Sequence, residues 1–397
     1  MKIINVKTKN IKIDSSVKTI GVMTVFIVII LVVLPLIFLG TGKGINSEFS
    51  LDNNDIVKNS NIVFPVDGKV KLYRKSEDRV EELDLEDYIM GVVASEVPAS
   101  FEEEALKAQA VAARTFYMNK RNNPDKDSKA KGAEVCDTIN CQVYMSKEER
   151  VSKWGKSQAE SNWERIRESV LDTKGQVLTY DGKVLEYPQF FATSSGKTED
   201  AKDVFSVDVP YLKSEESKGE EIAPKYKTTI KIPVSEFVNK VTGRYTNSNI
   251  KKDNLLSQIK IESYTEGGSV KEIKVGNTTI KGTEFRELFN LNSTNFKLSF
   301  ENNVVSVNCT GYGHGVGMSQ WGANVMAKNG SAYEEILKHY YNGVKIQEIE
   351  YKWHGIISRY SELSLENINM EEIFVINFKY YKYFFFFCLK NKKKDII

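Results

Sequence analysis

The sequence is poor in cysteine and carries almost no excess charge of either sign. Four cysteines in 397 residues are too few for a disulfide scaffold. Lysine and arginine number 55 and aspartate and glutamate 53, so the formal net charge is only +2. A protein that binds nucleic acid needs a strongly basic surface, so we predict no nucleic-acid partner. Internal repeats are also absent, and 41% hydrophobic residues are ample for a globular core.

One long apolar run stands near the start of the chain. Residues 20–39 carry no charge and have about the 20-residue length that spans a bilayer as a helix. Residues 1–19 hold five lysines and one acid, so the positive-inside rule predicts that they stay in the cytoplasm. A cleaved signal peptide has a shorter apolar core, and it remains the alternative. We therefore predict a single-pass protein of the cell membrane whose main part lies outside the cytoplasm.

The rest of the chain divides by composition. Residues 41–61 are polar and predict a stalk between the membrane and the folded part. Residues 62–350 mix helical and strand patterns, and strand patterns dominate at 225–300, which suggests a smaller inserted subdomain. Residues 352–397 hold an aromatic run and a basic cluster without periodicity, and we expect a poorly ordered tail; a second membrane segment is the alternative. The predicted fold class is α+β.

Two helices follow each other early in the folded part. Asp84 is a suitable N-cap for the first, whose apolar residues keep helical spacing until Pro98. A capping box from Ser100 to Glu103 predicts the start of the second, which is rich in alanine. Glu96 lies on the apolar face at the end of the first helix. Partial burial there raises the pKa of a carboxyl group, as a general acid near neutral pH requires. A solvated glutamate at a frayed helix end is the alternative.

A glycine-rich loop occupies residues 311–322. Four glycines alternate with other residues around His314, one of three histidines in the chain. Such a loop brings backbone amides close to a ligand, and it leads into a short helix. His314, Ser319 and Gln320 would then stand where the loop meets the helix. A tight structural crossing, in which the glycines only permit close packing, explains the same pattern.

These segments together resemble the stage II sporulation protein D family, which also includes amidase-enhancer proteins. The resemblance covers about residues 64–344. The matching segments are Tyr88–Pro98, Glu104–Thr115, Phe191–Gly196, Val209–Leu212, Asn290–Phe296 and Gly313–Gln320. The last segment alone is hard to match by chance, and a membrane anchor with an external domain agrees with the resemblance.

The resemblance implies a lytic transglycosylase that cuts the MurNAc-GlcNAc β-1,4 bond of peptidoglycan strands whose stem peptides have been removed. It implies Glu96 as the single acid and base, which protonates the glycosidic oxygen and then helps the muramic acid's own hydroxyl to close a 1,6-anhydro ring. One carboxylate then suffices, where ordinary glycosidases use two. The setting would be forespore engulfment, in the space between mother cell and forespore. The implied partners are stage II sporulation proteins M and P, the latter an amidase that removes the stem peptides.

The resemblance also implies a substrate groove around Glu96. The residues that would position the sugar chain are Arg114, Thr193, Tyr211, Lys213, His314 and Gln320. From the residues alone, Arg114 is equally well explained as an exposed arginine on an alanine-rich helix. Thr193 stands in a hydroxyl-rich turn that suits a saccharide, although such residues are also ordinary in turns.

Cys136 and Cys141 stand where some family members bind zinc through cysteine and histidine. Two thiolates are half of a tetrahedral zinc site, and no histidine occurs between the membrane segment and His314. His314, a carboxylate or Cys309 would have to complete it. A zinc ion here would be structural, and we expect the activity to need no cofactor. A disulfide across the short loop and two free thiols are the alternatives.

Two other functions remain open from the sequence. The same fold could bind glycan without cutting it and activate a peptidoglycan amidase. Alternatively, a second carboxylate such as Asp200 or Asp203 could lie across the groove from Glu96. That enzyme would be a hydrolase and would leave a reducing end instead of an anhydro end.

Overall fold

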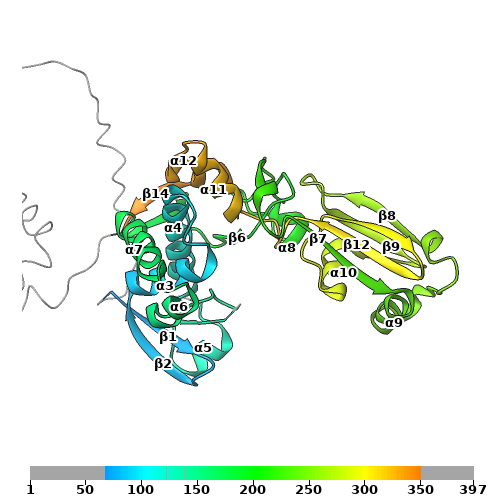
Figure 1. Cartoon of the computed structure of the whole chain (residues 1–397), viewed down its shortest axis with the longest axis horizontal. Helices are drawn as coiled ribbons and strands as arrows, with labels where there is room; N and C mark the ends of the chain where they lie inside the picture. The colour runs from blue at the N-terminus through cyan, green and yellow to red at the C-terminus, as the bar shows by residue number, and fades with distance from the viewer. Residues whose placement is uncertain (1–67, 122, 139, 350–397) are drawn as a thin grey trace, which may run out of the picture. The chain divides into compact units, whose positions relative to one another are not determined.

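The computed structural model describes residues 68–349, apart from residues 122 and 139 (Figure 1). The predicted segments 1–19, 20–39, 41–61 and 352–397 lie outside the described residues. Within the described part, no helix is long and apolar enough to cross a membrane. The predicted α+β class is confirmed, since ten α-helices and five small sheets make up the described chain.

The described chain has two separate hydrophobic cores. We call the part around the first core the main lobe. The chain enters the second core at residue 227. Before that point the elements of the main lobe are β1 (Lys69–Arg74), β2 (Arg79–Asp84), α3 (Leu85–Glu96), α4 (Glu103–Lys120), α5 (Lys126–Ala130), β3 (Val135–Cys136), α6 (Lys147–Lys153), α7 (Ala159–Asp172), β4 (Gln176–Tyr180), β5 (Lys183–Val184), β6 (Phe190–Phe191) and α8 (Ala201–Phe205). After residue 310 the main lobe continues with β13 (Met318–Ser319), α11 (Gln320–Lys328), α12 (Tyr333–Tyr340) and β14 (Lys345–Glu348). The main lobe is thus built from two stretches of chain.

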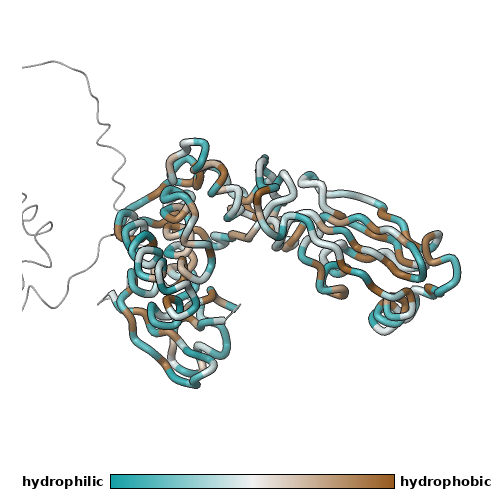
Figure 2. The backbone as a smooth tube through the Cα atoms, in the orientation of Figure 1, coloured by the Kyte–Doolittle hydropathy of each residue, from teal (hydrophilic) through white to brown (hydrophobic). Residues whose placement is uncertain are grey.

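Residues 227–310 surround the second core, and we call them the insert. Their elements are β7 (Lys227–Pro233), α9 (Val234–Arg244), β8 (Ile259–Tyr264), β9 (Val270–Val275), β10 (Thr278–Lys281), α10 (Gly282–Phe289), β11 (Phe296–Glu301) and β12 (Val304–Thr310). Two antiparallel sheets, β11-β12-β7 and β10-β9-β8, carry apolar and polar residues in alternation (Figure 2). The apolar sides meet a cluster of phenylalanines from α9 and α10. The range predicted for the inserted subdomain, 225–300, overlaps these residues.

The start of α3 agrees with the sequence prediction. The Asp84 carboxylate accepts a hydrogen bond from the backbone N–H of Glu86 at 3.0 Å, as an N-cap does. The helix ends at Glu96 because Val97 is extended, which is the conformation that the following Pro98 favours. Leu85, Tyr88, Ile89 and the two valines of this helix are fully buried in the main lobe. The position of Glu96 at the end of a buried helix therefore follows from local sequence.

The capping box predicted at Ser100–Glu103 does not form at the start of α4. The N-cap of α4 is Glu102, without a side-chain cap, because the N–H of Phe101 bonds the carbonyl of Pro98 and holds Ser100 in a preceding turn. The N-cap of α12 is Ala332, whose N–H donates to the Glu335 carboxylate at 3.1 Å. The alanine-rich helix exists where it was expected, and only its capping residue differs.

Two stretches without regular structure lie between α6 and β6. Residues 154–158, which include Gly155, separate α6 from α7. β5 and β6 are strands of two residues each, and Pro188, which cannot donate to a ladder, lies between them. β6 then pairs in parallel with β13 and brings the segment after Phe191 beside the glycine-rich loop.

Candidate active site

Glu96, the last residue of α3, is half-buried in the main lobe. The backbone N–H of Val143 donates to its Oε1 at 3.1 Å, and the side-chain amide of Gln320 also interacts with the carboxylate. Burial raises the pKa of this carboxyl above its usual value, and the two donors oppose the rise without cancelling it. The raised pKa predicted from the sequence is therefore present, and its cause is desolvation.

The chain segment that carries Val143 is pressed against α3. The ring of Tyr144 stacks on Tyr88, with ring centroids 5.6 Å apart and an interplanar angle of 15°. It also covers Gly91, where an added Cβ would collide with the Tyr144 ring and lie 2.6 Å from the carbonyl oxygen of Met145. Only glycine leaves this space. Gly91 therefore lets the segment approach closely enough for Val143 to reach Glu96.

A cleft of about 420 Å³ opens beside Glu96. It is lined by Ser95, Glu96, Val97, Pro98, Ala99, Ser100, Arg150, Trp154, Gln158 and Asn162. One wall is the end of α3 and the turn after it, and the other is formed by α6, α7 and the chain between them. Glu96 is the only carboxylate in this lining. The cleft offers space for a ligand next to a carboxyl group with a raised pKa.

Gln320, the first residue of α11, is almost fully buried next to Glu96. Its Nε2 donates to Oε1 of Gln109 on α4 at 3.5 Å, and Gln109 is itself completely buried. Ser319 fixes the start of α11, since its hydroxyl accepts the N–H of Gly322 as the N-cap. Gln320 is thus the member of the predicted groove that the structure brings to Glu96.

Glu220 lies beneath the start of α11 and is also buried. It accepts hydrogen bonds from the Ser319 hydroxyl at 2.6 Å, the Ser217 hydroxyl at 2.5 Å and the Ser194 N–H at 2.8 Å. Burial raises the pKa of this carboxyl to about 7 in spite of these donors. Glu220 therefore ties the N-cap of α11 to the segment that follows β6.

Arg114 lies in the interior, which does not fit the groove role predicted from the resemblance. Its guanidinium is completely buried and forms a two-point ion pair with Glu86 on α3, at 2.5 and 3.2 Å. It also donates to the carbonyl oxygens of Val170 on α7 and Gln176 on β4. The buried guanidinium thus connects α4 with α3, α7 and β4. It is not accessible to a sugar.

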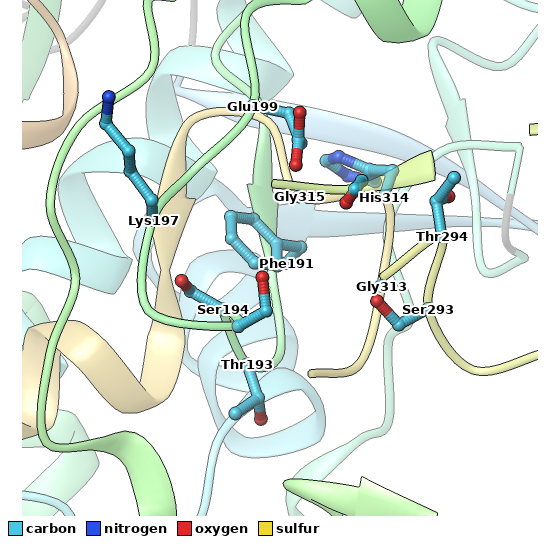
Figure 3. Close-up of a pocket in the computed structure, with 12 residues that line it drawn as sticks. Phe191, Thr193, Ser194, Lys197, Glu199, Ser293, Thr294, Gly313, His314 and Gly315 are labelled. Carbon is cyan, nitrogen blue, oxygen red and sulfur yellow. The ribbon is translucent and has the colours of Figure 1, made fainter. Parts of the chain in front are cut away.

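Thr193 and His314 line a second, much smaller pocket, with room of about 10 Å³ (Figure 3). This space suits about one water molecule. Glu199 is also in the lining, 3% exposed, and neither of its carboxylate oxygens makes a hydrogen bond of good geometry with a described residue. The hydroxyls of Thr265 and Ser269 favour its ionised form, but burial outweighs them and raises its pKa.

His314 uses both ring nitrogens to hold the backbone. Its Nδ1 accepts the N–H of Val316 at 3.1 Å, so the proton is on Nε2, which donates to the carbonyl oxygen of Phe190 at 3.1 Å. Burial lowers its pKa to about 4, and the ring stays neutral at pH 7. Gly313 and Gly315 on either side have φ values of 122° and 87°, which favour glycine. The histidine thus fixes the path of the glycine-rich loop.

Tyr211 and Lys213 are placed apart from the cleft lining. The Tyr211 ring is buried, and its hydroxyl accepts the N–H of Tyr187 at 3.0 Å. The Lys213 ammonium forms ion pairs with Asp200 at 3.3 Å and Asp208 at 2.7 Å. Asp203, the other acid proposed as a second carboxylate, pairs with Lys271 of the insert at 2.8 Å.

Cys136 and Cys141 come together with Asp125, and their three ligand atoms lie within 4.8 Å of one another. The two sulfur atoms are 3.0 Å apart, and the Cys141 sulfur is 3.2 Å from Asp125 Oδ2. The close thiol partner lowers the pKa of Cys136 to about 6 and raises that of Cys141. Two sulfurs and one carboxylate fit three of the four positions around a zinc ion. Cys309 lies instead in the core of the insert.

The sequence did not single out Gln109, Val143, Arg150, Trp154 or Glu199. The donor of Val143 is its backbone N–H, so the type of residue at this position does not predict the contact. Glu199 lies three residues beyond a matching segment, so the resemblance pointed near it without reaching it. Arg150 and Trp154 had one local signal, the spacing of a charged and an aromatic residue by one helical turn.

The comparisons with known proteins agree with the resemblance. The family model described as Stage II sporulation protein matches residues 73–180. Stage II sporulation protein D of Bacillus subtilis (strain 168) is 40% identical over 281 residues, 71% of this chain and 79% of the relative. The chain belongs to the stage II sporulation protein D family. Membership places it in sporulation and is consistent with an enzyme that acts on the cell wall.

Two further relatives show the breadth of the family. The stage II sporulation protein D of Bacillus amyloliquefaciens is 39% identical over 281 residues, again 71% of this chain and 79% of the relative. A more distant relative is the amidase enhancer of Bacillus subtilis (strain 168), 26% identical over 310 residues, 65% of this chain and 40% of the relative. One relative of this chain is thus named for enhancing another enzyme.

Proposed function

We propose that this protein is a lytic transglycosylase that cuts the MurNAc-GlcNAc bond of peptidoglycan strands without stem peptides. The observation that carries the proposal is Glu96: one half-buried carboxyl with a raised pKa, in a cleft whose lining holds no second carboxylate. A hydrolase of the usual kind needs two carboxylates across the bond. The proposed reaction needs one.

In the proposed mechanism the protonated Glu96 donates its proton to the glycosidic oxygen as the bond to the anomeric carbon breaks. The carboxylate then accepts the proton of the muramic acid's C6 hydroxyl, whose oxygen bonds the anomeric carbon and closes the 1,6-anhydro ring. No water enters, and Glu96 ends protonated as it began. Val143 and Gln320 would stabilise the carboxylate between the two steps, because the Val143 N–H donates to it and the Gln320 amide favours its ionised form.

The second candidate is a non-catalytic activator of a peptidoglycan amidase. The relative named amidase enhancer favours it, since it matches 65% of this chain. Such a protein would bind glycan in the same cleft without proton transfer. Replacement of Glu96 by alanine separates the two candidates, because an activator keeps its function and an enzyme does not.

The test is mass spectrometry of soluble products after the full-length protein, in detergent, is incubated with purified strands that lack stem peptides. We expect anhydro-ended fragments from the natural protein and none from Glu96→Ala. Reducing ends would indicate a hydrolase with a second carboxylate. Absence of fragments from both proteins, with binding retained, would favour the amidase activator.

The setting is also a proposal. The family's role in sporulation supports action during forespore engulfment, beside stage II sporulation proteins M and P. The apolar run at 20–39 would hold the protein in the cell membrane with the main lobe outside the cytoplasm. A zinc ion, where one is bound, would be held by Asp125, Cys136 and Cys141 and would stabilise the segment that leads to Val143. The proposed reaction itself needs no cofactor.

A further inference from the structure

Arg150 lies in the wall of the Glu96 cleft and has no counter-ion among the described residues. It lies on α6, and no carboxylate of the described residues pairs with its guanidinium. Its Nε is buried and makes no hydrogen bond within the described chain. By contrast, Arg74, Arg114 and Arg167 all have acidic partners. The guanidinium of Arg150 is therefore partly desolvated and keeps unused donors next to the cleft.

Trp154 holds this guanidinium in place. The central carbon of Arg150 lies 4.7 Å from the centroid of the Trp154 ring. A cation over an aromatic face is attracted to the ring, and the stacking leaves the N–H groups at the guanidinium edge free to donate in the plane. Burial without a counter-ion also disfavours the charged form and lowers the pKa of Arg150. An anion bound at that edge would relieve this unfavourable desolvation.

We propose that Arg150 and Trp154 form a subsite for the lactyl carboxylate of a MurNAc residue from which the stem peptide has been removed. The inference rests on the proposed function and names the feature of the strand that the cleft recognises. A guanidinium binds a carboxylate through two parallel hydrogen bonds. When a stem peptide is attached, the same carbon is an amide, which has no negative charge and carries a bulky substituent. The subsite would thus select strands that an amidase has already processed.

The rest of the lining agrees with a sugar acid as the ligand. Gln158 and Asn162 offer amides and Ser95 and Ser100 offer hydroxyls, all suited to sugar hydroxyl and acetamido groups. Glu96 is the only carboxyl group of the lining and is protonated when the proposed reaction begins, so a substrate anion meets little repulsion there. Arg150 is the only cation of the lining. A neutral oligosaccharide would leave it unpaired.

The test uses two substrates that differ only in that carboxylate. Denuded strands are compared with the same strands after their lactyl carboxylates have been converted to methylamides. Binding is measured with the Glu96→Gln variant and turnover with Glu96 intact. We expect methylamidation to weaken both by about 10- to 100-fold, the effect of losing a hydrogen-bonded charge pair. Arg150→Gln should weaken binding and turnover of denuded strands by the same factor. On methylamidated strands the substitution should cause no further loss.

Two control variants separate recognition from folding. Arg167→Gln removes an exposed arginine of α7 that pairs with Glu164 outside the cleft lining. It should leave the binding and turnover of both substrates unchanged. Arg150→Lys keeps the charge without the planar fork and should recover part of the discrimination. Equal losses on both substrates for Arg150→Gln, or no discrimination by the natural protein, would overturn the inference. Discrimination in binding without any cleavage would overturn the proposed reaction and keep the subsite.

Discussion

Glu96 and Glu199 are two buried carboxyl groups with raised pKa values and opposite surroundings. Glu96 is half-buried, accepts the Val143 N–H at 3.1 Å and faces a cleft of about 420 Å³. Glu199 is 3% exposed, makes no hydrogen bond of good geometry and faces room of about 10 Å³. A raised pKa is thus common to both, and it does not identify a catalytic acid. A hydrogen bond of good geometry and space for the substrate distinguish Glu96.

The test with the largest expected effect removes each carboxyl group in turn. Glu96→Gln should lower the rate of strand cleavage by about 100- to 10,000-fold, because general acid-base catalysis contributes about that much. Glu199→Gln should leave the rate within a few-fold of the natural protein, since its oxygens cannot reach a substrate. Anhydro-ended products measured over time check both. A comparable loss in both variants would show that the two sites act together.

Glu220 sharpens the comparison, because it is as buried as Glu199 and has three hydrogen-bond donors. Its folded pKa of about 7 lies above the usual value of 4.5, so the folded state holds the proton more tightly than the unfolded state. The stability that this group contributes is present below pH 4.5 and is lost as the pH rises toward 7. Over that window we expect a loss of about 3 kcal/mol in the natural protein.

The measurement for Glu220 is urea unfolding at several pH values. Glu220→Gln cannot titrate, so its free energy of unfolding should fall less between pH 4.5 and 7 than that of the natural protein. Parallel curves for the two proteins would mean that the folded pKa of Glu220 is not raised. The same experiment on Glu199→Gln should show a change of the same sign, since burial raises that pKa as well.

A third test disturbs the donors of Glu96 while leaving Glu199 untouched. Gly91→Ala would force the Tyr144 ring and the carbonyl of Met145 away from α3. We expect a loss of about 1–3 kcal/mol in the free energy of unfolding, as for other overpacked sites, and a lower cleavage rate as Val143 moves. Gly243→Ala in α9 is the matched control, because nothing lies within 4 Å of an added Cβ there. Similar rates in both variants would exclude this role of Gly91.

The prediction with the smallest expected effect concerns the donors of Glu96. Gln320→Leu removes one donor to the Glu96 carboxylate, which raises the pKa of Glu96 further. Since the first step needs the protonated acid, the alkaline limb of the pH-rate profile should move to higher pH, with a loss of rate of less than about tenfold. An unmoved limb would show that the Gln320 amide does not control the ionisation of Glu96.

The sequence predicted those parts of the site that depend on neighbours along the chain. The Asp84 cap, the length of α3 and the partial burial of Glu96 at its end are local features, and all are found. Arg114 could not be placed, because the side of α4 that meets Glu86 is decided by packing between helices. The capping box at Ser100 failed because a turn through Phe101 competes with it.

The donors of Glu96 were beyond prediction for a similar reason. Val143 and Gln320 come from segments far apart in the chain, and each reaches Glu96 only after the main lobe has assembled. The buried Nε of Arg150 has no hydrogen-bond partner among the described residues, and local sequence cannot predict such an absence. Local patterns predicted elements, and tertiary packing decided which residues share the cleft.

The insert leaves and rejoins the main lobe through one pair of strands. Lys227 at the start of β7 lies opposite Thr310 at the end of β12, in adjacent antiparallel strands. Partners in such a pair have Cα atoms only about 5 Å apart, so residues 228–309 begin and end at nearly the same point. A short turn could replace them without moving the ends that they join. The same geometry lets a chain acquire such a unit in a single event, as an addition to a lobe that already had its own core.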